Sequence, residues 1–324
     1  MELRLGFAGT GWIGLSRLRS VAQSGAARVA AIFDIDPEQQ KRACEIAPGA
    51  RPATSFEALF DSNLDGLVIA TPNSAHEPQA LAALDRGIAV FCQKPLALGA
   101  EGARRIVDAA RVNHRLVGVD LCYRYTAAVS AMKALLMNHQ LGDIYAAELA
   151  FHNAYGPDRQ WYYDSTRSGG GCVLDLGTHL VDLVLWLLDD FAVCNLTARL
   201  HRPRATSASG TEDYATVQFN TNGGAAVSIA CSWRLHTMND AYIFAGLYGT
   251  DGGVEFKNLN GSFYDFSSTH ISQRRTVTLA SPPDDWSGRA ILDWIRKLRQ
   301  GTGFDRAAEH VVDVAEVIDR IYRQ

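Results

Sequence analysis

Three side chains in one apolar segment have the types and the spacing for acid–base chemistry. Asp175, His179 and Asp182 lie in the run GGGCVLDLGTHLVD, residues 169–182, where most other residues are apolar or glycine. Steps of four and three residues return to the same face of a helix, so the three side chains share one narrow stripe. A carboxylate that hydrogen-bonds an imidazole fixes its tautomer and favours its protonated form, which suits a general acid or base near neutral pH.

Two other uses of this stripe stay open. A buried aspartate and histidine at this spacing can simply satisfy each other's hydrogen bonds. The spacing also fits a metal ion, but a single histidine without a cysteine makes a poor ligand set, so we expect no metal.

A lysine at the end of an apolar run is the second candidate for chemistry. The stretch VFCQKP, residues 90–95, passes from apolar residues to Gln93, Lys94 and Pro95. Pro95 biases the residue before it toward extended backbone angles, which holds the ammonium at a fixed bearing off the strand end. A tight turn here also accommodates a cis bond before the proline.

A glycine-rich loop follows the first apolar run. Its motif, G-x-G-x-x-G, consists of Gly9, Thr10, Gly11, Trp12, Ile13 and Gly14. The first glycine permits a tight turn, the second lets a pyrophosphate approach the backbone, and the third lets helix and strand pack closely. Amides at the start of the following helix then hold the phosphates. Alone, such a loop can also be a purely structural turn.

Asp34 supplies the context that the glycine loop needs. It ends the second apolar run, 20 residues beyond Gly14. An acid in this place accepts hydrogen bonds from the adenosine ribose and repels a 2′-phosphate. Because Asp36 follows and no arginine occurs until Arg42, we expect NAD rather than NADP. The alternative is a solvated aspartate in a turn.

The elements that must position these residues can be read from hydrophobic periodicity. Up to residue 121, short apolar runs alternate with amphipathic segments of helical length. The expected strands are residues 3–8, 29–33, 66–70, 88–92 and 116–119, and the expected helices are residues 12–24, 37–47, 75–86 and 100–113. Near-continuous apolar strands that alternate with helices indicate a doubly wound parallel sheet, an α/β Rossmann domain.

After residue 121 the pattern becomes that of an α+β domain with a large, mostly antiparallel open sheet. A helix is expected over 126–138, a strand over 144–151 and a very apolar helix over 173–188. Residues 226–233 alternate with period two, and hairpin turns are expected at 222–224, 251–253 and 260–261. We therefore expect an NAD-binding domain at 1–121 and a substrate-binding and oligomerisation domain at 122–324. Two C-terminal helices within 285–324, broken at 301–303, could pack back on the first domain.

Composition excludes several classes of protein. The chain has 324 residues, 47% of them hydrophobic and 20% charged, with a net charge of −4 and no dense basic run. This argues against a nucleic-acid or membrane surface and favours a small-molecule enzyme. No apolar segment reaches 18 residues, and we expect a cytoplasmic protein. Six scattered cysteines suggest neither disulfides nor a zinc site.

Together and in this order, these motifs resemble the Gfo/Idh/MocA family of NAD(P)-dependent oxidoreductases, in particular its inositol dehydrogenase-like members. The likeness includes the glycine loop, the Lys-Pro pair and the glycine-led Asp-x-x-x-His segment. It also includes ATPN at residues 70–73, followed by His76, and Arg124 soon after the strand at 116–119. The resemblance covers essentially the whole chain.

The resemblance implies a role for each matching residue. Lys94, Asp175 and His179 form the catalytic group: the histidine takes a hydroxyl proton while hydride leaves the same carbon for the nicotinamide. Asp175 orients the imidazole, and Lys94 stabilises negative charge on the reacting oxygen. The matching cofactor residues, besides the glycine loop and Asp34, are Thr71, Pro72, Asn73, His76, Gln93 and Lys94. Arg124 matches a position close to the substrate, and Trp161 and Tyr162 are plausible lining residues.

Gln93 departs from the family pattern, which usually reads Glu-Lys-Pro. Glutamine is nearly isosteric with glutamate and can still hydrogen-bond, but it carries no charge to favour a protonated lysine. What Gln93 does to Lys94 is therefore a question for the structure.

Three functions remain after this comparison. The leading one is hydride transfer between NAD and a secondary alcohol or ketone of a sugar, cyclitol or sugar derivative. Aromatic side chains between residues 153 and 166 suit such a ligand. The alternatives are an NAD-dependent glycoside hydrolase and a non-catalytic NAD-binding sensor. A long sheet with helices on one face also predicts a homodimer or homotetramer.

Overall fold

Two compact units make up the chain. The computed structural model describes residues 2–202, 210–273 and 275–324. One unit comprises Met1–Cys122 and Ser287–Val312, and the other comprises Tyr123–Trp286 and Asp313–Gln324. The C-terminal segment thus contributes to both units, and the expected boundary after residue 121 lies beside the first division.

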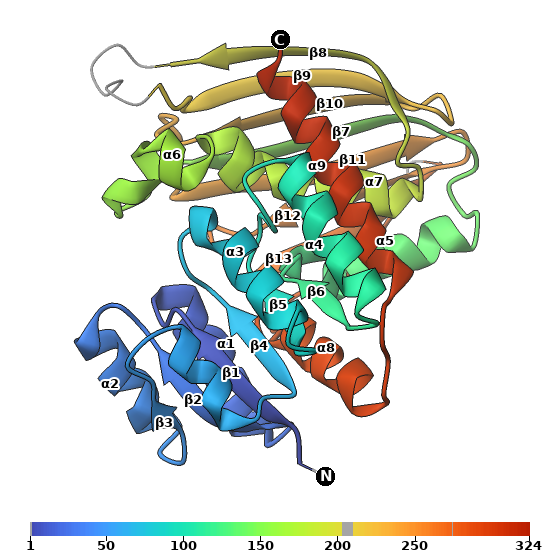
Figure 1. The fold of residues 1–324 in the computed structure, drawn as a ribbon. Coiled ribbons are helices and arrows are strands. Elements are labelled where there is room, and N and C mark those ends of the chain that lie inside the picture. Colours follow the sequence, from blue (N-terminus) through green and yellow to red (C-terminus); the bar gives the residue numbers. More distant parts are fainter. Residues whose placement is uncertain (1, 203–209, 274) are drawn as a thin grey trace. The chain divides into compact units, whose positions relative to one another are not determined.

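The first unit contains the expected doubly wound parallel sheet, with strand order β3-β2-β1-β4-β5-β6 (Figure 1). Its strands are β1 (Arg4–Ala8), β2 (Arg28–Phe33), β3 (Arg51–Pro52), β4 (Gly66–Ile69), β5 (Ala89–Cys92) and β6 (Val117–Val119). Its longer helices are α1 (Trp12–Ser24), α2 (Pro37–Ile46), α3 (Asn73–Leu84), α4 (Ala100–Val112) and α8 (Arg289–Arg299), with a short 3-10 helix, η1 (Glu57–Ser62). β3 was not expected from the sequence, because its two residues are exposed and carry no apolar run.

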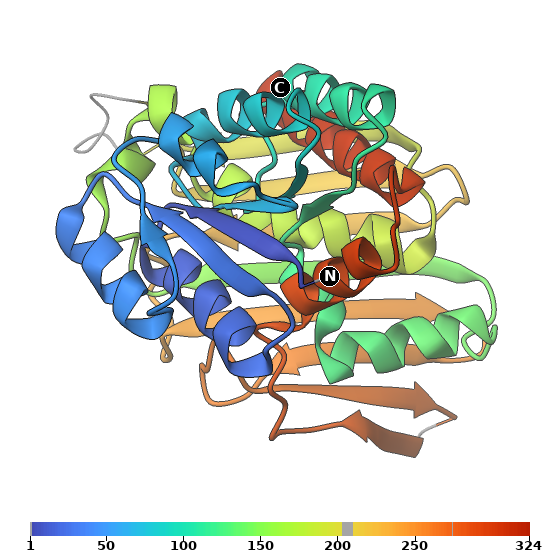
Figure 2. The same ribbon diagram turned by 60° about the horizontal axis from the view of Figure 1, so that its bottom comes forward.

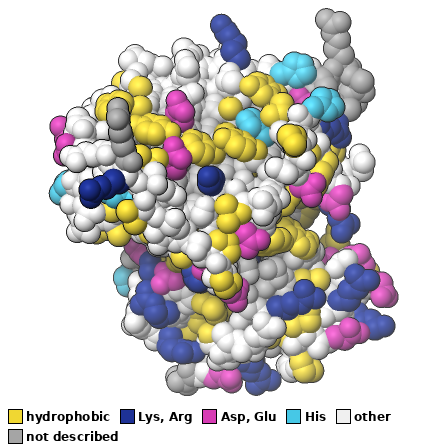
Figure 3. All heavy atoms as spheres, turned by 180° about the vertical axis from the view of Figure 1, so that it is seen from behind, with side chains coloured by type: hydrophobic (Ala, Val, Ile, Leu, Met, Phe, Trp, Pro, Cys, Tyr) yellow, Lys and Arg dark blue, Asp and Glu magenta, His cyan; other side chains and the backbone are white. Residues whose placement is uncertain are grey.

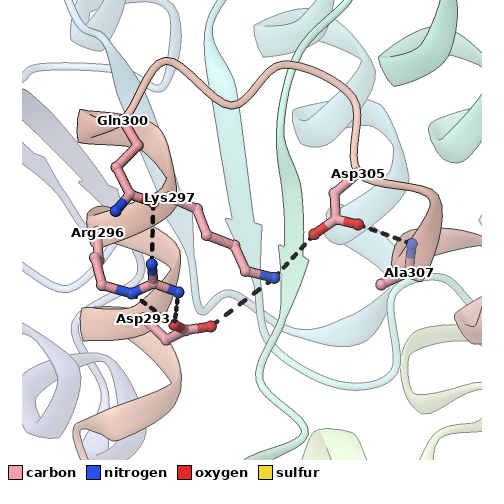
Figure 4. A network of polar contacts seen from close by, with 6 residues as sticks. All are labelled: Asp293, Arg296, Lys297, Gln300, Asp305 and Ala307. Atoms are coloured by element: carbon pink, nitrogen blue, oxygen red, sulfur yellow. Dashed lines mark hydrogen bonds and ion pairs between the residues drawn. The ribbon is translucent and has the colours of Figure 1, made fainter.

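Helix α8 returns from the C-terminal part of the chain to this sheet. Trp294 packs on Phe91 of β5, with ring centroids 5.7 Å apart. A Cβ at Gly118 would lie 2.7 Å from the Trp294 ring, so the missing side chain makes room for the indole. Beyond the helix, Lys297 Nζ donates to Asp305 Oδ2 at 2.8 Å, and Asp305 Oδ1 accepts from the amide of Ala307 at 3.0 Å (Figure 4). This polar network fixes the turn between α8 and the short helix η5 (Arg306–Ala308).

The second unit contains an eight-stranded sheet with order β14-β13-β12-β11-β7-β10-β9-β8. The strands are β7 (Ile144–Asn153), β8 (Val193–His201), β9 (Tyr214–Thr221), β10 (Ala226–Ser232), β11 (Ala241–Gly249), β12 (Gly253–Asn258), β13 (Phe266–Ser272) and β14 (Arg275–Ala280). All neighbouring pairs are antiparallel except β7 with β10. This confirms the mostly antiparallel sheet, and the three expected hairpin turns join β9 to β10, β11 to β12, and β12 to β13.

Helices cover one face of this sheet (Figure 2). They include α5 (Ala127–Met137), η4 (Val173–Gly177), α7 (Thr178–Leu188) and the end of α9 (Glu309–Tyr322). The described part of this region also contains the short helices η2 (Cys122–Tyr125), η3 (Gln160–Tyr163) and α6 (Ser165–Ser168). α5 begins at Thr126, whose hydroxyl accepts from the amide of Val129 at 3.1 Å. Buried side chains alternate along the strands beneath, as at Val227, Ile229 and Cys231 of β10.

One helical stretch among the described residues, Ser165–Leu188, is long and apolar enough to cross a membrane. Its most apolar window is 83% buried inside the protein, so its apolar side chains already have partners.

Candidate active site

The glycine loop joins β1 to α1, and its three glycines have different surroundings. Gly9 has φ +85°, and a Cβ there would lie 2.5 Å from the carbonyl of Ala70. A Cβ at Gly14 would lie 2.2 Å from the carbonyl oxygen of Gly9. At Gly11, in contrast, nothing stands within 4 Å of such an atom. The outer glycines therefore serve close packing, and the middle one leaves space beside the start of α1.

Asp34 lies beside this loop, at the end of β2. Its Oδ2 accepts from the amide of Thr10 at 2.6 Å and from the Thr10 hydroxyl at 3.0 Å, and its Oδ1 accepts from the amide of Asp36 at 2.9 Å. These bonds hold the carboxylate at the carboxyl edge of the sheet. Trp12, at the first position of α1, is 73% exposed, and Ile13 is half-buried beside it.

The segment after β4 is tied to the segment after β5 by His76. One ring nitrogen lies 2.7 Å from the carbonyl oxygen of Pro95, and the other lies 2.8 Å from that of Thr71. Burial lowers the pKa of His76, the positive charge of Lys94 lowers it further, and the two carbonyl contacts act against this. His76 is 1% exposed, and its two contacts fix the segment that contains Thr71, Pro72 and Asn73.

Lys94 lies two residues beyond the end of β5, and the peptide bond between it and Pro95 is cis. The neighbouring Gln93 is buried, and its amide nitrogen donates to a carboxylate oxygen of Asp120, just beyond β6. Arg17 of α1 binds the same oxygen. The strand end that carries the lysine is thus tied to β6 and α1 by polar side chains.

The helix with the acid–base stripe does not begin as the regular α-helix that its sequence suggests. Residues Val173–Gly177 form a π-helical turn, and the α-helix begins only at Thr178. Such turns insert a residue and re-aim the side chains near them, and they are frequent at functional sites. Asp175 therefore lies on the π-helical turn, whereas His179 and Asp182 lie on the α-helix that follows it.

The start of this helix is capped by a buried carboxylate that the sequence did not reveal. Glu212, 1% exposed, accepts from the amides of Gly171 and Val173 at 3.1 and 2.9 Å. The hydroxyl of Tyr322, from α9, donates to the same carboxylate at 2.9 Å. Burial raises the pKa of Glu212, and these hydrogen bonds lower it. An anion at a helix start also meets the positive end of the helix dipole.

Asp175 is oriented by a tryptophan. The indole Nε1 of Trp233, directly after β10, donates to Asp175 Oδ2 at 3.0 Å. Tyr162 and Tyr163 pack edge-on against the Trp233 ring, with centroids 6.3 and 5.6 Å away. Burial raises the pKa of Tyr162, and the charge of Asp175 raises it further. The aromatic segment around Tyr162 therefore lies close to the carboxylate.

His179 is 8% exposed and lies among aromatic rings. The ring of Tyr123 meets it edge-on with centroids 4.9 Å apart, and Phe151 of β7 lies 6.3 Å away. Both neighbours belong to the same unit as the histidine. Packing thus holds the imidazole in one orientation.

Arg124 and Asp182 form an ion pair in the second unit. Arg124 Nε donates to Asp182 Oδ2 at 2.9 Å, and a second guanidinium nitrogen binds Oδ1, so the pair is bidentate. The guanidinium also lies over the Trp186 ring, 5.3 Å from its centroid. Two of the Arg124 nitrogens therefore bind Asp182 and help to position the helix. Trp161, the other candidate lining residue, stacks on Tyr162 with centroids 3.9 Å apart.

The comparisons with known proteins cover both units. A family model described as an oxidoreductase family with an NAD-binding Rossmann fold matches residues 3–121, and one for the GFO/IDH/MocA C-terminal domain matches residues 129–255. Inositol 2-dehydrogenase 3 of Saccharopolyspora erythraea is 31% identical over 97% of this chain and 85% of its own. The chain belongs to the Gfo/Idh/MocA family of oxidoreductases.

Further relatives agree with this membership of the Gfo/Idh/MocA family. The inositol 2-dehydrogenase of Cereibacter sphaeroides is 34% identical, over 93% of this chain and 87% of its own. Levoglucosan dehydrogenase, solved with NADH and levoglucosan, has the same fold with TM-score 0.85 and 21% identity, covering 100% of this chain and 97% of that one. GenD2 from gentamicin A biosynthesis, solved with NAD, has TM-score 0.83 and 24% identity, covering 99% and 93%.

As a member of this family, the chain is an NAD(P)-dependent oxidoreductase of the class that acts on CH–OH groups. Some structural neighbours were solved with NADP, for example KijD10 of Actinomadura kijaniata, with TM-score 0.86 and 18% identity, covering 100% of this chain and 98% of that one. Among the described residues, no group of three or more His, Cys, Asp or Glu side chains could hold a metal ion.

Four residues around these side chains were missed by sequence reasoning: Arg17, Asp120, Glu212 and Trp233. Each acts on a partner far away in the chain; Trp233 and Asp175, for example, are 58 residues apart. A polar residue inside an apolar pattern was the only available signal. Arg17 gives that signal in α1, since it has the helical spacing of Gly14, Leu18 and Val21, which the structure buries with it.

Proposed function

We propose that this chain is an NAD-dependent dehydrogenase or reductase of a secondary alcohol or ketone in a sugar, cyclitol or sugar derivative. The proposal rests on one observation above all: Asp175 and His179 lie near the start of one helix, where Trp233 binds the carboxylate and Tyr123 packs on the imidazole. A carboxylate and an imidazole that are each held in one orientation suit a general acid or base.

The proposed roles follow from the chemistry of each group. His179 accepts the hydroxyl proton of the substrate in the oxidation direction and returns it in reduction. Asp175 stabilises the charged imidazole. Lys94 hydrogen-bonds the reacting oxygen and stabilises the negative charge that develops on it. A bound nicotinamide would supply the hydride acceptor in oxidation and the hydride donor in reduction. In oxidation both electrons leave the carbon with the hydride while His179 takes the proton, and in reduction His179 returns it.

The cofactor proposed is NAD, with NADP as the weaker ligand. The glycine loop has room at Gly11 for a pyrophosphate, and the carboxylate of Asp34 lies 2.6 Å from the amide of Thr10 in that loop. A carboxylate here binds ribose hydroxyls and repels the additional phosphate of NADP. Thr71, Pro72, Asn73, Gln93 and Lys94 are proposed to face the rest of the cofactor, with His76 behind them.

The substrate class is supported by two further points. The two relatives named above at 31% and 34% identity are inositol 2-dehydrogenases. Trp161 and Tyr162 present stacked aromatic faces near Asp175, and such faces pack on the C–H faces of sugars and cyclitols. Arg124 is proposed to reach the substrate with donors that Asp182 does not use.

Absorbance at 340 nm tests the proposal directly. The purified protein is mixed with NAD or NADP and a panel of inositols, aldoses, glycosides and nucleotide sugars. We expect NADH to accumulate from NAD with at least one polyol, and NADPH to accumulate from NADP more slowly. His179→Ala should lower kcat by about 10²–10⁴-fold, the usual worth of a positioned general acid or base. His139→Ala, at an exposed position, is the matched control and should leave turnover unchanged.

Other outcomes lead to other functions. Undiminished turnover in His179→Ala would remove the proton-transfer role of this residue. Release of an aglycone without net NADH would favour the glycoside hydrolase. Binding of NAD without turnover of any substrate would favour the sensor.

A further inference from the structure

Asp120 is a buried carboxylate to which the proposed chemistry assigns no role. It follows β6, and its side chain is fully buried beside that of Arg17, which is 3% exposed. Arg17 Nε donates to Asp120 Oδ2 at 2.6 Å. The amide of Gln93 donates to the same oxygen, whereas Oδ1 has no hydrogen-bond partner among the described residues. Two donors from different elements thus converge on one carboxylate oxygen.

This convergence determines which side chain position 93 can carry. A carboxylate only accepts hydrogen bonds, so the group that faces Asp120 must be a donor, and the amide nitrogen of glutamine provides one. A glutamate at position 93 would place a second carboxylate oxygen within hydrogen-bond distance of Oδ2. Two carboxylates at that distance cannot both stay ionised. A glutamine at position 93 is therefore the side chain that fits beside Asp120. At this edge of the sheet, the residue with the negative charge follows β6, and the residue after β5 is neutral.

The backbone of Lys94 lies next to the contact between Gln93 and Asp120. Its Cα lies about 3.8 Å from that of Gln93, as in any trans peptide. The thiol of Cys122 lies near all three charges: burial and the charge of Asp120 raise its pKa to about 12, while Arg17 and Lys94 act in the opposite direction. On the other side of Lys94, the carbonyl of Pro95 is held by His76 at 2.7 Å. The backbone of Lys94 is thus fixed on both flanks.

We propose that Asp120, anchored by Arg17, is a positioning residue for Lys94 and acts through the side chain of Gln93. The inference rests on the proposed function of Lys94 and deepens it. In this arrangement Asp120 supplies the carboxylate that the usual Glu-Lys-Pro pattern carries one residue before the lysine. A glutamate at position 93 should therefore be tolerated only if Asp120 is replaced by a residue without a carboxylate.

A swap of the two side chains tests this pairing. Gln93→Glu, Asp120→Asn and the double variant are compared with wild type. Either single variant should lower the melting temperature by about 6–12 °C, since one creates a carboxylate pair and the other removes the buried anion that faces Arg17. Either should also lower kcat about 10- to 100-fold through misplacement of Lys94. The double variant restores one carboxylate and one amide and should recover most of both losses.

Two controls keep the outcomes distinct. Gln140→Glu adds a carboxylate at an exposed position and should change neither quantity. The rate of reductive methylation at Lys94, measured by mass spectrometry against exposed Lys41, needs no turnover. It should change at least threefold in each single variant and return in the double variant.

The proposal is overturned if the two substitutions are additive, or if the melting temperature falls while kcat and Lys94 labelling stay unchanged. The second result would make the network merely structural. Failure of the proposed dehydrogenase would appear already as absent turnover in wild type, and labelling would still decide the role of Asp120.

Discussion

A single substitution can test the contact between Trp233 and Asp175, which is proposed to be catalytic. The Trp233 indole donates to Asp175 Oδ2, and the rest of its ring packs in the core at 2% exposure. Trp233→Phe removes the donor and keeps most of the packing. We expect kcat to fall about 10-fold, as for the loss of one hydrogen bond to a charged group, with KM for the substrate changing much less. Steady-state kinetics check this.

Trp294→Phe is the matched control for Trp233→Phe. It removes the same atoms from another tryptophan of similar burial, and its Nε1 has no partner among the described residues. Its kcat should stay near that of wild type. An equal loss in both variants would attribute the effect to packing rather than to the contact with Asp175.

Residue types and spacing were enough to single out the proposed catalytic side chains but not their supports. Lys94, Asp175 and His179 stand out because each is polar within an apolar run and lies near a strand end or on a helical stripe. Asp120 and Trp233 could not be assigned in this way. Their partners lie 27 and 58 residues away, and only the folded sheets bring them together.

At the scale of elements, the start of the helix that carries Asp175 and His179 depends on Glu212. The carboxylate accepts hydrogen bonds from the first amides of this helix, and burial raises the pKa of Glu212. Glu212→Gln keeps the shape but turns one acceptor into a donor that faces other donors. We expect a loss of about 1–3 kcal/mol in the free energy of unfolding, the cost of leaving buried polar groups unsatisfied.

The pH dependence of this loss has a definite sign. Because burial raises the folded pKa of Glu212 above its unfolded value near 4.5, the folded state holds this proton more tightly. The stability from this group is fully present below the unfolded pKa and is lost as pH rises through the folded pKa. Wild type should therefore exceed Glu212→Gln by more at pH 5 than at pH 8 in thermal unfolding. An advantage that grew with pH would contradict the raised pKa.

Periodicity predicted most elements to within a few residues, since strands such as β5 and helices such as α4 have continuous apolar faces. It failed where geometry depends on tertiary contacts. The π-helical turn at Val173–Gly177 interrupts a sequence with ordinary helical spacing, and β3 is too short and too exposed to leave a pattern. Register at such places is decided by capping and packing rather than by local propensity.

At the scale of the whole molecule, the face of the eight-stranded sheet opposite α5 and α7 carries an aromatic row. His152 stacks between Tyr214 and Tyr242 with centroids 6.2 Å away on each side, and Phe244 continues the row 6.4 Å from Tyr242. Figure 3 views this face, on which hydrophobic side chains gather. Tyr242 is 48% exposed. Contiguous apolar surface of this kind is typical of contacts between subunits.

We therefore expect this face to pair identical subunits. A row of nearly parallel rings on one sheet face can pack against its own copy about a two-fold axis, since the same patch then meets itself. Light scattering at micromolar concentration should give a dimer or tetramer for wild type. Tyr242→Arg should shift it toward the monomer, because a charge would be buried without a partner. Tyr145→Arg, at an exposed tyrosine near the start of β7 and outside the aromatic row, should not. A monomeric wild type, or equal behaviour of both variants, would locate any subunit contact elsewhere.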